Sequence, residues 1–206
     1  MPRTGNSVGF DFGLKTFLKG SDGYEEQSPE FFKKSIKEVK KASKKVSKKK
    51  KDSTNRRKAT LNLARVHKKI ANQRLDFHFK LAKFLAEKHA IICIEDLNIK
   101  AIKRLWGRKI SDLAFSEFVR ILYYQCSKTG TIIAQIPRFY PSSKTCSNCG
   151  HLLEELDLKK REWICPISSK THDRDLNAAI NIHRVGMELL SARKGNSTCR
   201  SGRASK

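Results

Sequence analysis

Apolar residues recur along the chain at two spacings, one typical of strands and one typical of helices. Short apolar stretches at 8–12 and 14–18 flank Gly13 and precede a GSDG turn, so they predict a hairpin. Residues 90–94 form an apolar run that ends in two acids, which predicts a buried central strand, and residues 131–137 predict another strand. These stretches predict the strands of a mixed sheet.

Three further segments carry the period of an amphipathic helix. In residues 59–89 apolar side chains recur three, four and seven positions apart, with Arg and Lys opposite them. Residues 112–128 predict a second helix, with Asp112 as its N-cap and Gly130 just past its end. Residues 175–192 predict a third helix. Because strands and helices alternate, the sequence predicts an α/β domain with a mixed sheet.

The segment 33–58 is dense in lysine and arginine, and Glu38 and Asp52 are its only acids. Its weak apolar spacing predicts a helix that frays into KKKKDSTNRRK. Runs of one charge are usually solvated loops, which is one interpretation of this segment. The other interpretation is an arm that binds phosphates and becomes ordered on its ligand. The sequence is compatible with both.

The charge balance favours a nucleic-acid partner. The 206 residues include 44 Lys and Arg against 20 Asp and Glu, a formal net charge of +24, and such a field attracts polyanions. An anionic membrane is the alternative, but the sequence has no run of 18 apolar residues and no signal-peptide pattern. We therefore expect a cytoplasmic protein that binds nucleic acid and not a membrane, with reduced cysteines.

Three acids lie where metal-dependent chemistry could use them. Asp11 interrupts an apolar strand, where an uncompensated charge is costly, Glu95 ends the 90–94 run, and Asp175 begins the last helix. Carboxylates suit Mg²⁺ or Mn²⁺, and two such cations about 3.5–4 Å apart can promote phosphodiester cleavage. Gly13, which lacks a Cβ, would let the backbone approach a ligand closely.

Each of these acids also has an ordinary interpretation: Asp11 as a turn residue, Glu95 as a salt-bridge partner and Asp175 as a helix N-cap. Their neighbours add ambiguity, since Asp96 follows Glu95 and Asp173 precedes Asp175 by two positions. Strand alternation directs Glu95 and Asp96 to opposite faces, so at most one of them points into a site. The pattern alone leaves both choices open.

Residues 138–172 are rich in cysteine and turn formers, and three cysteines follow most of the spacing of a zinc ribbon: Cys146, Cys149 and Cys165. Ser168 stands at the place of the fourth ligand, and Ser169 stands where a glycine is usual. Because a serine hydroxyl is a poor zinc ligand, a four-cysteine site is excluded. His172, which follows the second turn, or His151 could complete a Cys₃His site, or the site could be weak or empty.

Four motifs occur in a characteristic order: VGFDFGLK, IICIEDLNIK, PSSKTCSNCG and HDRDLNAAINI. Together they resemble the transposon-encoded TnpB (OrfB) family of bacteria, over residues 8 to about 190. The resemblance implies an RNase H-like (RuvC-type) domain, a mixed sheet flanked by helices, with an inserted zinc-ribbon-like module. The expected parts are the first nuclease segment, the insertion, the closing helix and a disordered basic tail, at 1–137, 138–172, 173–192 and 193–206.

The resemblance also implies cleavage of DNA that is guided by RNA and uses Mg²⁺, so DNA and a guide RNA are the implied partners, at the bacterial nucleoid. It assigns catalytic metal binding to Asp11, Glu95 and Asp175, in preference to their acidic neighbours. It assigns zinc to the three cysteines named above.

Two departures from the family pattern affect these expectations. Ser168 replaces the family's fourth cysteine. Family members also carry a large N-terminal half, whereas only seven residues precede the first predicted strand. We expect a truncated or split protein, for which the missing half would be a further partner. The leading hypothesis is a metal-dependent DNA endonuclease, and the alternative is a catalytically impaired remnant that binds nucleic acid.

Overall fold

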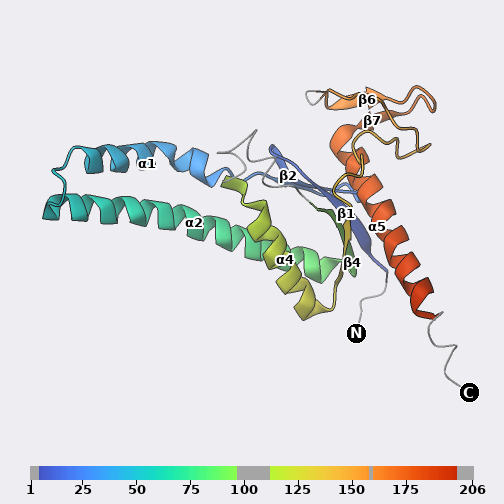
Figure 1. Cartoon of the computed structure of the whole chain (residues 1–206), viewed down its shortest axis with the longest axis horizontal. Helices are drawn as coiled ribbons and strands as arrows, with labels where there is room; N and C mark the ends of the chain where they lie inside the picture. Colours follow the sequence, from blue (N-terminus) through green and yellow to red (C-terminus); the bar gives the residue numbers. More distant parts are fainter. Residues whose placement is uncertain (1–4, 97–111, 158–159, 199–206) are drawn as a thin grey trace, which may run out of the picture.

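The computed structural model describes residues 5–96, 112–157 and 160–198, and its centre is a five-stranded sheet (Figure 1). The strands are β1 (Ser7–Phe12), β2 (Thr16–Gly20), β3 (Glu25–Gln27), β4 (Ile91–Glu95) and β5 (Ile132–Ile136). Their order across the sheet is β3-β2-β1-β4-β5. The pairs β1–β2 and β2–β3 are antiparallel, and β1–β4 and β4–β5 are parallel. The predicted mixed α/β architecture is confirmed.

The β1–β2 turn explains one glycine differently from the sequence prediction. The Gly13 N–H donates to the Phe17 carbonyl at 3.4 Å, and a Cβ on Gly13 would lie 2.6 Å from the Thr16 carbonyl oxygen. The close approach that requires glycine is therefore made by the hairpin's own backbone, not by a ligand. The hairpin's second strand begins at Thr16, two residues later than expected.

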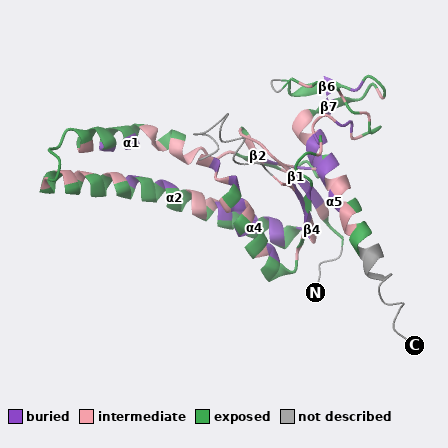
Figure 2. Cartoon of the chain, in the orientation of Figure 1, coloured by how far each residue is buried: buried purple, intermediate pink, exposed green. Residues whose placement is uncertain are grey.

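The two faces of the sheet are covered differently. Val8, Phe10, Ile92 and Ile94 point to one face, where they form the main core with α2 (Thr54–Lys88) and α4 (Phe115–Thr129). Figure 2 shows buried segments on the strands and on α4, where the sheet and these helices meet. Helix α5 (Arg174–Thr198) packs on the other face.

Helix α5 approaches the sheet at backbone distance. A Cβ on Gly9 of β1 would collide with the Ala179 carbonyl and the His183 amide of α5, and a Cβ on Gly186 would collide with Cys93 of β4. Because side chains alternate along a strand, Asp11 and Glu95 share this face with Gly9 and Cys93.

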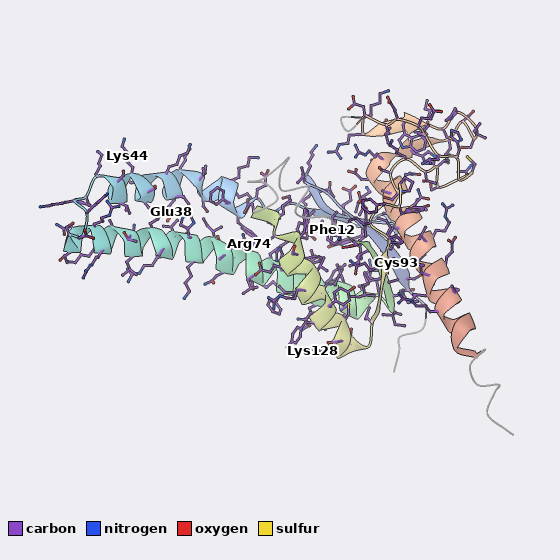
Figure 3. The ribbon with its side chains drawn as sticks, viewed as in Figure 1. Phe12, Glu38, Lys44, Arg74, Cys93 and Lys128 are labelled. Atoms are coloured by element: carbon purple, nitrogen blue, oxygen red, sulfur yellow. The ribbon has the colours of Figure 1, made fainter. Side chains whose placement is uncertain are left out.

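Helices α1 (Phe31–Ser47) and α2 form an antiparallel hairpin that extends away from the sheet (Figure 1). Its seam contains four buried apolar residues: Val39, Ala42, Val66 and Ile70. Lysines such as Lys44 project from its outer surface (Figure 3). The expectation of a fraying helix is wrong here. Residues 48–53 form a short connection, Ser53 caps α2 by accepting from the Arg56 N–H at 3.2 Å, and the Arg56 side chain donates to the Lys49 carbonyl at 3.2 Å.

Asp112 has a different role from the predicted one. Ala114, with φ of 47°, occupies the N-cap position of α4, and the Asp112 carboxylate instead accepts from the Phe32 N–H of α1 at 3.0 Å. It therefore satisfies a backbone donor in the first turn of a helix 80 residues earlier in the chain. The predicted end of the helix is confirmed, since Gly130 is its C-cap with φ of 75°.

The insertion forms a small module above the N-terminus of α5 (Figure 1). Its strands β6 (Glu162–Ile164) and β7 (Thr171–Asp173) make a separate antiparallel pair. Helix α5 continues to Thr198, beyond the expected start of the tail at 193, and residues 199–206 lie outside the described residues. In the parts of the chain that the structure describes, no helix combines the length and apolar character needed to cross a bilayer.

Gly9→Ala is expected to lower the melting temperature, because the added methyl group would collide with the α5 backbone. Overpacking of this kind costs about 1–3 kcal/mol, which is roughly 2–12 °C in a chain of this size. Thermal denaturation followed by circular dichroism measures the shift.

Gly23→Ala is the control for this substitution. Open space surrounds Gly23, so only its φ of 85° is unfavourable for alanine. A loss for Gly9→Ala no larger than that for Gly23→Ala would contradict the close packing of α5.

Candidate metal centre

The carboxyl ends of β1 and β4 bring two of the three acids together. These parallel strands pair Phe10 with Ile94, so continuing the register by one residue sets Asp11 beside Glu95. Both side chains point to the α5 face, and Asp175 is the second residue of α5. A cavity of about 390 Å³ at this edge is lined by all three acids. The structure therefore places the three acids that the family resemblance selects around one cavity, although among the described residues their oxygens do not form a group of donors within 4.8 Å of one another.

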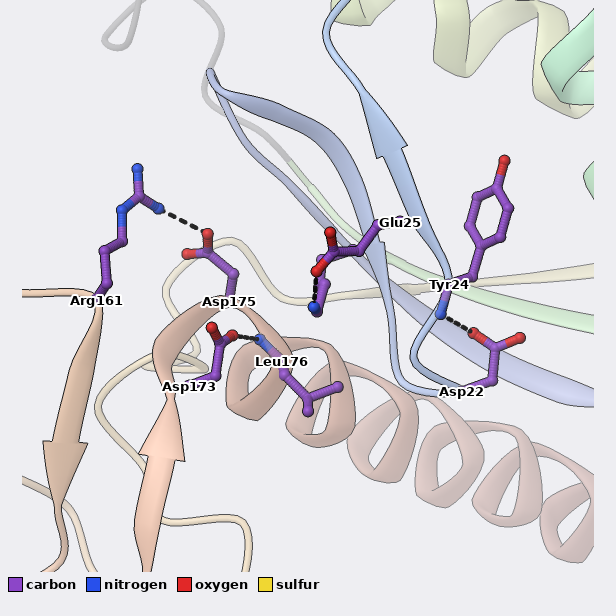
Figure 4. A network of polar contacts seen from close by, with 8 residues as sticks. Asp22, Tyr24, Glu25, Arg161, Asp173, Asp175 and Leu176 are labelled. Atoms are coloured by element: carbon purple, nitrogen blue, oxygen red, sulfur yellow. Dashed lines mark hydrogen bonds and ion pairs between the residues drawn. The ribbon is translucent and has the colours of Figure 1, made fainter.

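The neighbouring acids have other partners, and Figure 4 shows the one of Asp173. Asp96, which alternation directs away from Glu95, forms an ion pair with Arg138 at 2.7 Å. Asp173 accepts from the Leu176 N–H at 2.7 Å and so acts as the N-cap of α5, the role that Asp175 had as its ordinary interpretation. Neither Asp96 nor Asp173 lines the cavity.

The environment of the three acids disfavours three simultaneous negative charges. Burial, followed by the charges of Asp175 and Glu95, raises the pKa of Asp11 to about 8, although the charge of Arg174 opposes this. Burial and the charge of Asp96 raise the pKa of Glu95 to about 7. Carboxylates in this situation bind protons or cations. Their hard oxygen donors fit Mg²⁺ or Mn²⁺.

Two arginines also line this cavity, and the sequence analysis did not identify them. Arg161, from the insertion, forms an ion pair with Asp175 at 2.6 Å (Figure 4). Its carbonyl accepts from the Arg174 N–H at 2.8 Å. Arg174 could have been noticed because it precedes Asp175 directly, whereas no local pattern marks Arg161. The guanidinium groups give the cavity donors for phosphate oxygens.

Two buried asparagines of α5 hold the start of the insertion against the helix. The side-chain amides of Asn177 and Asn181 donate to the Thr145 carbonyl at 2.8 and 2.6 Å, and to the Ser142 carbonyl at 3.4 and 2.9 Å. The Ser147 N–H donates to the side-chain oxygen of Asn177, Oδ1, at 2.9 Å. These contacts fix residues 142–147 next to the cavity. The apolar spacing that predicts this helix does not single out the two asparagines.

The three cysteines of the insertion also converge. The sulfur atoms of Cys146, Cys149 and Cys165 lie within 4.8 Å of one another, which allows them to hold a metal ion such as zinc. Trp163 packs against them in a small apolar cluster. Burial opposes ionisation of the Cys165 thiol, but hydrogen bonds from Ser168, Ile167 and Cys149 lower its pKa to about 6, which favours the thiolate that zinc binds.

The cysteines lie on two turns with the same backbone hydrogen bonds. In the first turn the Cys146 N–H donates to the His151 carbonyl and the Gly150 N–H to the Cys146 carbonyl, at 2.8 and 2.9 Å. In the second turn the Cys165 N–H donates to the Lys170 carbonyl at 3.0 Å, and the Ser169 N–H donates to the Cys165 carbonyl at 2.9 Å. The equivalence gives Ser168 the position that Cys149 has in the first turn.

The same equivalence explains the glycine that is usual after the fourth ligand. Gly150 has φ of 78° in the first turn, and Ser169 adopts φ of 53° at the matching place in the second. A left-handed conformation of this kind favours glycine, and serine occupies it at a cost in free energy. The second turn therefore keeps its backbone shape although both side chains depart from the pattern.

Two other side chains lie next to the sulfurs. His172 Nε2 is 3.1 Å and Ser168 Oγ is 3.5 Å from Cys146 Sγ. The His172 ring is buried against Trp163, and burial and the charge of Lys170 lower its pKa, which keeps it neutral as a ligand must be. Among the described residues, the group of mutually close donors contains neither His172 nor His151.

Comparison with known proteins places this architecture in a family. The family model OrfB_IS605, described as "Probable transposase", matches residues 1–105, half of the chain. The chain belongs to the TnpB (OrfB) family. The model "Cas12f1-like, TNB domain" matches residues 115–182 of this TnpB-family chain, which include the cysteine module.

Curated relatives of the chain are longer proteins. One from Streptomyces pristinaespiralis, named "Putative RNA-guided DNA endonuclease", is 36% identical over 99% of this chain and 52% of its own length. TnpB-like protein L79 of Acanthamoeba polyphaga mimivirus is 34% identical over 61% of this chain and 25% of its own length. This TnpB-family chain thus spans about half the length, or less, of these relatives.

Solved structures share its fold. A CRISPR-Cas12f ternary complex aligns with 85% of this chain and 38% of its own, with a TM-score of 0.66 and 21% identity. A Cas12f1–sgRNA–target DNA complex aligns with 89% of this chain and 50% of its own, with a TM-score of 0.60 and 19% identity. The sheet and helices described above are therefore arranged as in Cas12f chains.

Asp11→Asn is expected to stabilise the metal-free chain at high pH. The pKa of Asp11 rises from 3.8 to about 8 on folding, so the folded chain holds a proton that the unfolded chain releases. The contribution of Asp11 to the free energy of unfolding is fully present at low pH and is lost as pH rises through about 8. Asparagine carries no charge. In EDTA near pH 9, the melting temperature of the Asp11→Asn variant should therefore exceed that of the unsubstituted chain by at least about 3 °C.

Asp96→Asn is the matched control, since Asp96 lies at the same sheet edge but has its own ion-pair partner. It should give a smaller gain, because the charge of Asp96 raises the pKa of Glu95 but is not among the causes that raise the pKa of Asp11. A difference between Asp11→Asn and the unsubstituted chain that does not change with pH would argue against the crowding of the three carboxylates.

Ser168→Cys is expected to raise the affinity for zinc. The backbone equivalence of the two turns puts the new thiol where a fourth ligand belongs. The zinc affinity should therefore rise by more than the roughly tenfold that follows from changing a residue that only contacts a ligand. Competition with a coloured zinc chelator measures the affinity.

Ile167→Cys is the control for the added thiol, since it changes the neighbouring residue of the same turn, whose side chain is exposed. Equal zinc affinities for the two variants would contradict the equivalence of the turns.

Proposed function

We propose that this TnpB-family chain is the nuclease part of an RNA-guided DNA endonuclease, and that it hydrolyses phosphodiester bonds in DNA with Mg²⁺ or Mn²⁺. The observation that supports this most is the meeting of three acids, from distant segments, in one cavity of a chain with net charge +24. Acids that repel one another in a strongly basic protein have a clear use as ligands of divalent cations.

The proposed fold is RNase H-like, of the RuvC type. The support is the strand order β3-β2-β1-β4-β5, with an antiparallel β1–β2–β3 meander followed by parallel β4 and β5. In a sheet with parallel strands, ligands bind beyond the carboxyl ends of those strands. Asp11 and Glu95 lie at that edge, which agrees with the proposal.

In the proposed mechanism Asp11, Glu95 and Asp175 hold the cations, which when bound supply an activated water and stabilise the leaving oxygen. The chain's own residues orient the substrate. Arg161 and Arg174 donate to phosphate oxygens of the DNA strand, and Arg161 exchanges its contact with Asp175 for one with a phosphate. Asn177 and Asn181 keep residues 142–147 of the insertion beside the cavity, and the Arg174 N–H holds the Arg161 carbonyl there.

The basic helical hairpin is proposed to hold nucleic acid outside the cavity. Residues 33–69 contain 17 Lys and Arg and two acids, and most of the basic side chains are exposed. The part of α2 in this basic surface, residues 54–69, spans about 24 Å, enough to follow roughly 7 base pairs of a duplex. The names and titles of the relatives indicate guide RNA and target DNA as the partners, and a nucleoid location follows from this proposal.

The insertion is proposed to be a zinc ribbon with an incomplete ligand set. Three thiolates would bind the ion, and His172 is the neighbouring imidazole that could add a fourth donor after a change of position. The proposed role of this zinc ribbon is structural, because the ribbon supports the segment that carries Arg161.

The nuclease proposal is tested by incubating the purified chain with Mg²⁺ or Mn²⁺ and a labelled single-stranded DNA. Glu95→Gln removes one ligand charge with little change of shape, and is expected to lower the cleavage rate at least about 100-fold. Asp11→Ala should do the same.

Asp96→Asn is the matched control and should keep most of the cleavage rate of the unsubstituted chain, since Asp96 pairs with Arg138 outside the cavity and acts on the cavity through the pKa of Glu95. Salt-sensitive DNA binding without cleavage by any variant would contradict the nuclease proposal and favour the binding remnant. Equal cleavage by the Glu95 and Asp96 variants would contradict the assignment of ligands.

A further inference from the structure

The turn that follows β5 lies at the same sheet edge as the acid cavity. Strands β1, β4 and β5 are parallel, so their carboxyl ends share one edge. The turn spans residues 137–140 and is closed by a hydrogen bond from the Tyr140 N–H to the Pro137 carbonyl at 3.1 Å. Phe139 stands at its corner, and the next residue, Tyr140, lines the cavity.

Both sides of this turn are anchored. On one side Arg138 pairs with Asp96 at 2.7 Å. On the other side the Tyr140 hydroxyl accepts from Arg184 at 3.3 Å, and the Ser142 carbonyl is held by the buried asparagines of α5. Phe139 therefore projects from a backbone whose neighbours on each side are fixed.

The Phe139 side chain is 89% exposed, the highest value among the large hydrophobic residues in the described part of the chain. Tyr140 beside it is half-buried and packs into an apolar cluster, so the core has no place for a second ring here. Single exposed apolar residues are common at protein surfaces. This one differs because it is a whole aromatic ring, held by an anchored turn, one residue from a cavity built for phosphate chemistry.

We propose that Phe139 is a base-stacking residue, which packs its ring against a nucleobase of the DNA strand whose phosphate enters the acid cavity. The inference deepens the proposed function and rests on it. A phosphate and its bases are joined through the sugars, so a strand held by the cavity arginines carries a neighbouring base to the rim. Stacking on an aromatic ring tolerates any sequence, because every base has a π-face.

The test uses single-stranded DNA oligonucleotides in which 2-aminopurine is moved through successive positions, with binding measured in EDTA so that no cutting occurs. The fluorescence of 2-aminopurine falls when it stacks, so the unsubstituted chain should quench it strongly at one or two positions. Phe139→Ala should remove this quenching and weaken binding about 5- to 150-fold, the range for loss of one base–aromatic stack.

Two further variants separate stacking from other effects. Phe139→Trp keeps an aromatic ring and should retain the quenching, whereas Phe139→Leu keeps apolar bulk without the ring and should lose it. Tyr124→Ala is the control, since Tyr124 is an exposed aromatic residue on α4, across the sheet from the cavity. It should bind and quench like the unsubstituted chain.

Equal affinity and equal quenching for the unsubstituted chain and Phe139→Ala would overturn the stacking proposal. An equal loss for Phe139→Ala and Tyr124→Ala would overturn it too. These results are distinct from failure of the nuclease proposal, which shows as absence of metal-dependent cleavage. Quenching that depends on Phe139 without any cleavage would leave stacking standing and refute only the nuclease.

Discussion

Helix α5 lies so close to the sheet that at two points only a glycine fits at the contact. Gly9 of β1 contacts the helix backbone, and Gly186 of the helix contacts Cys93 of β4. Together these contacts fix the axis of the helix across two parallel strands. The start of the helix then lies over the carboxyl ends of those strands, which is where Asp11 and Glu95 are. Asp175 joins them because of packing that occurs up to three helical turns away.

This packing concentrates negative charge at one place in a molecule that is otherwise strongly basic. Burial, followed by the charges of Asp175 and Glu95, raises the pKa of Asp11 to about 8, and burial with the charge of Asp96 raises the pKa of Glu95 to about 7. Arg161 and Arg174 relieve the repulsion from the rim only in part. The fold thus holds the acids in place at a cost to the metal-free protein. A divalent cation bound by the acids would reduce that cost, since it takes the place of protons.

The sequence predicted the elements around the cavity because burial imposes regular spacing on them. Strands β1, β4 and β5 and helices α2, α4 and α5 are each apolar on the side that packs. The choice between Glu95 and Asp96 could not follow from alternation, since it depends on which face α5 covers. That face is set by contacts between Gly9 and residues some 170 positions later. Only the family resemblance could select an acid before the fold was known.

Other features escaped prediction for related reasons. Strand β3 is a polar EEQ triplet whose place depends on pairing with β2. The basic segment was expected to fray, yet Val39 and Ala42 pack against Val66 and Ile70. The α2 side of that seam belongs to the periodic segment 59–89, whereas the spacing in α1 is weak, so the packing of α1 does not show in its own sequence. The cap that Asp112 provides for Phe32 links residues 80 positions apart, and no local pattern encodes it.

The cysteine module and the acid cavity are parts of one arrangement. Asn177 and Asn181 of α5 hold residues 142–147, the near end of the module, through hydrogen bonds. None of these bonds is made by a cysteine, although two of the bonded residues flank Cys146. The far turn carries Ser168 in place of a ligand, and β6 connects that turn to Arg161 at the cavity. A weakly held ion would therefore loosen the module from its far turn inward, while residues 142–147 stay fixed by α5. Arg161 is the cavity residue most exposed to that loosening, because its position depends on the second turn and not on the asparagines.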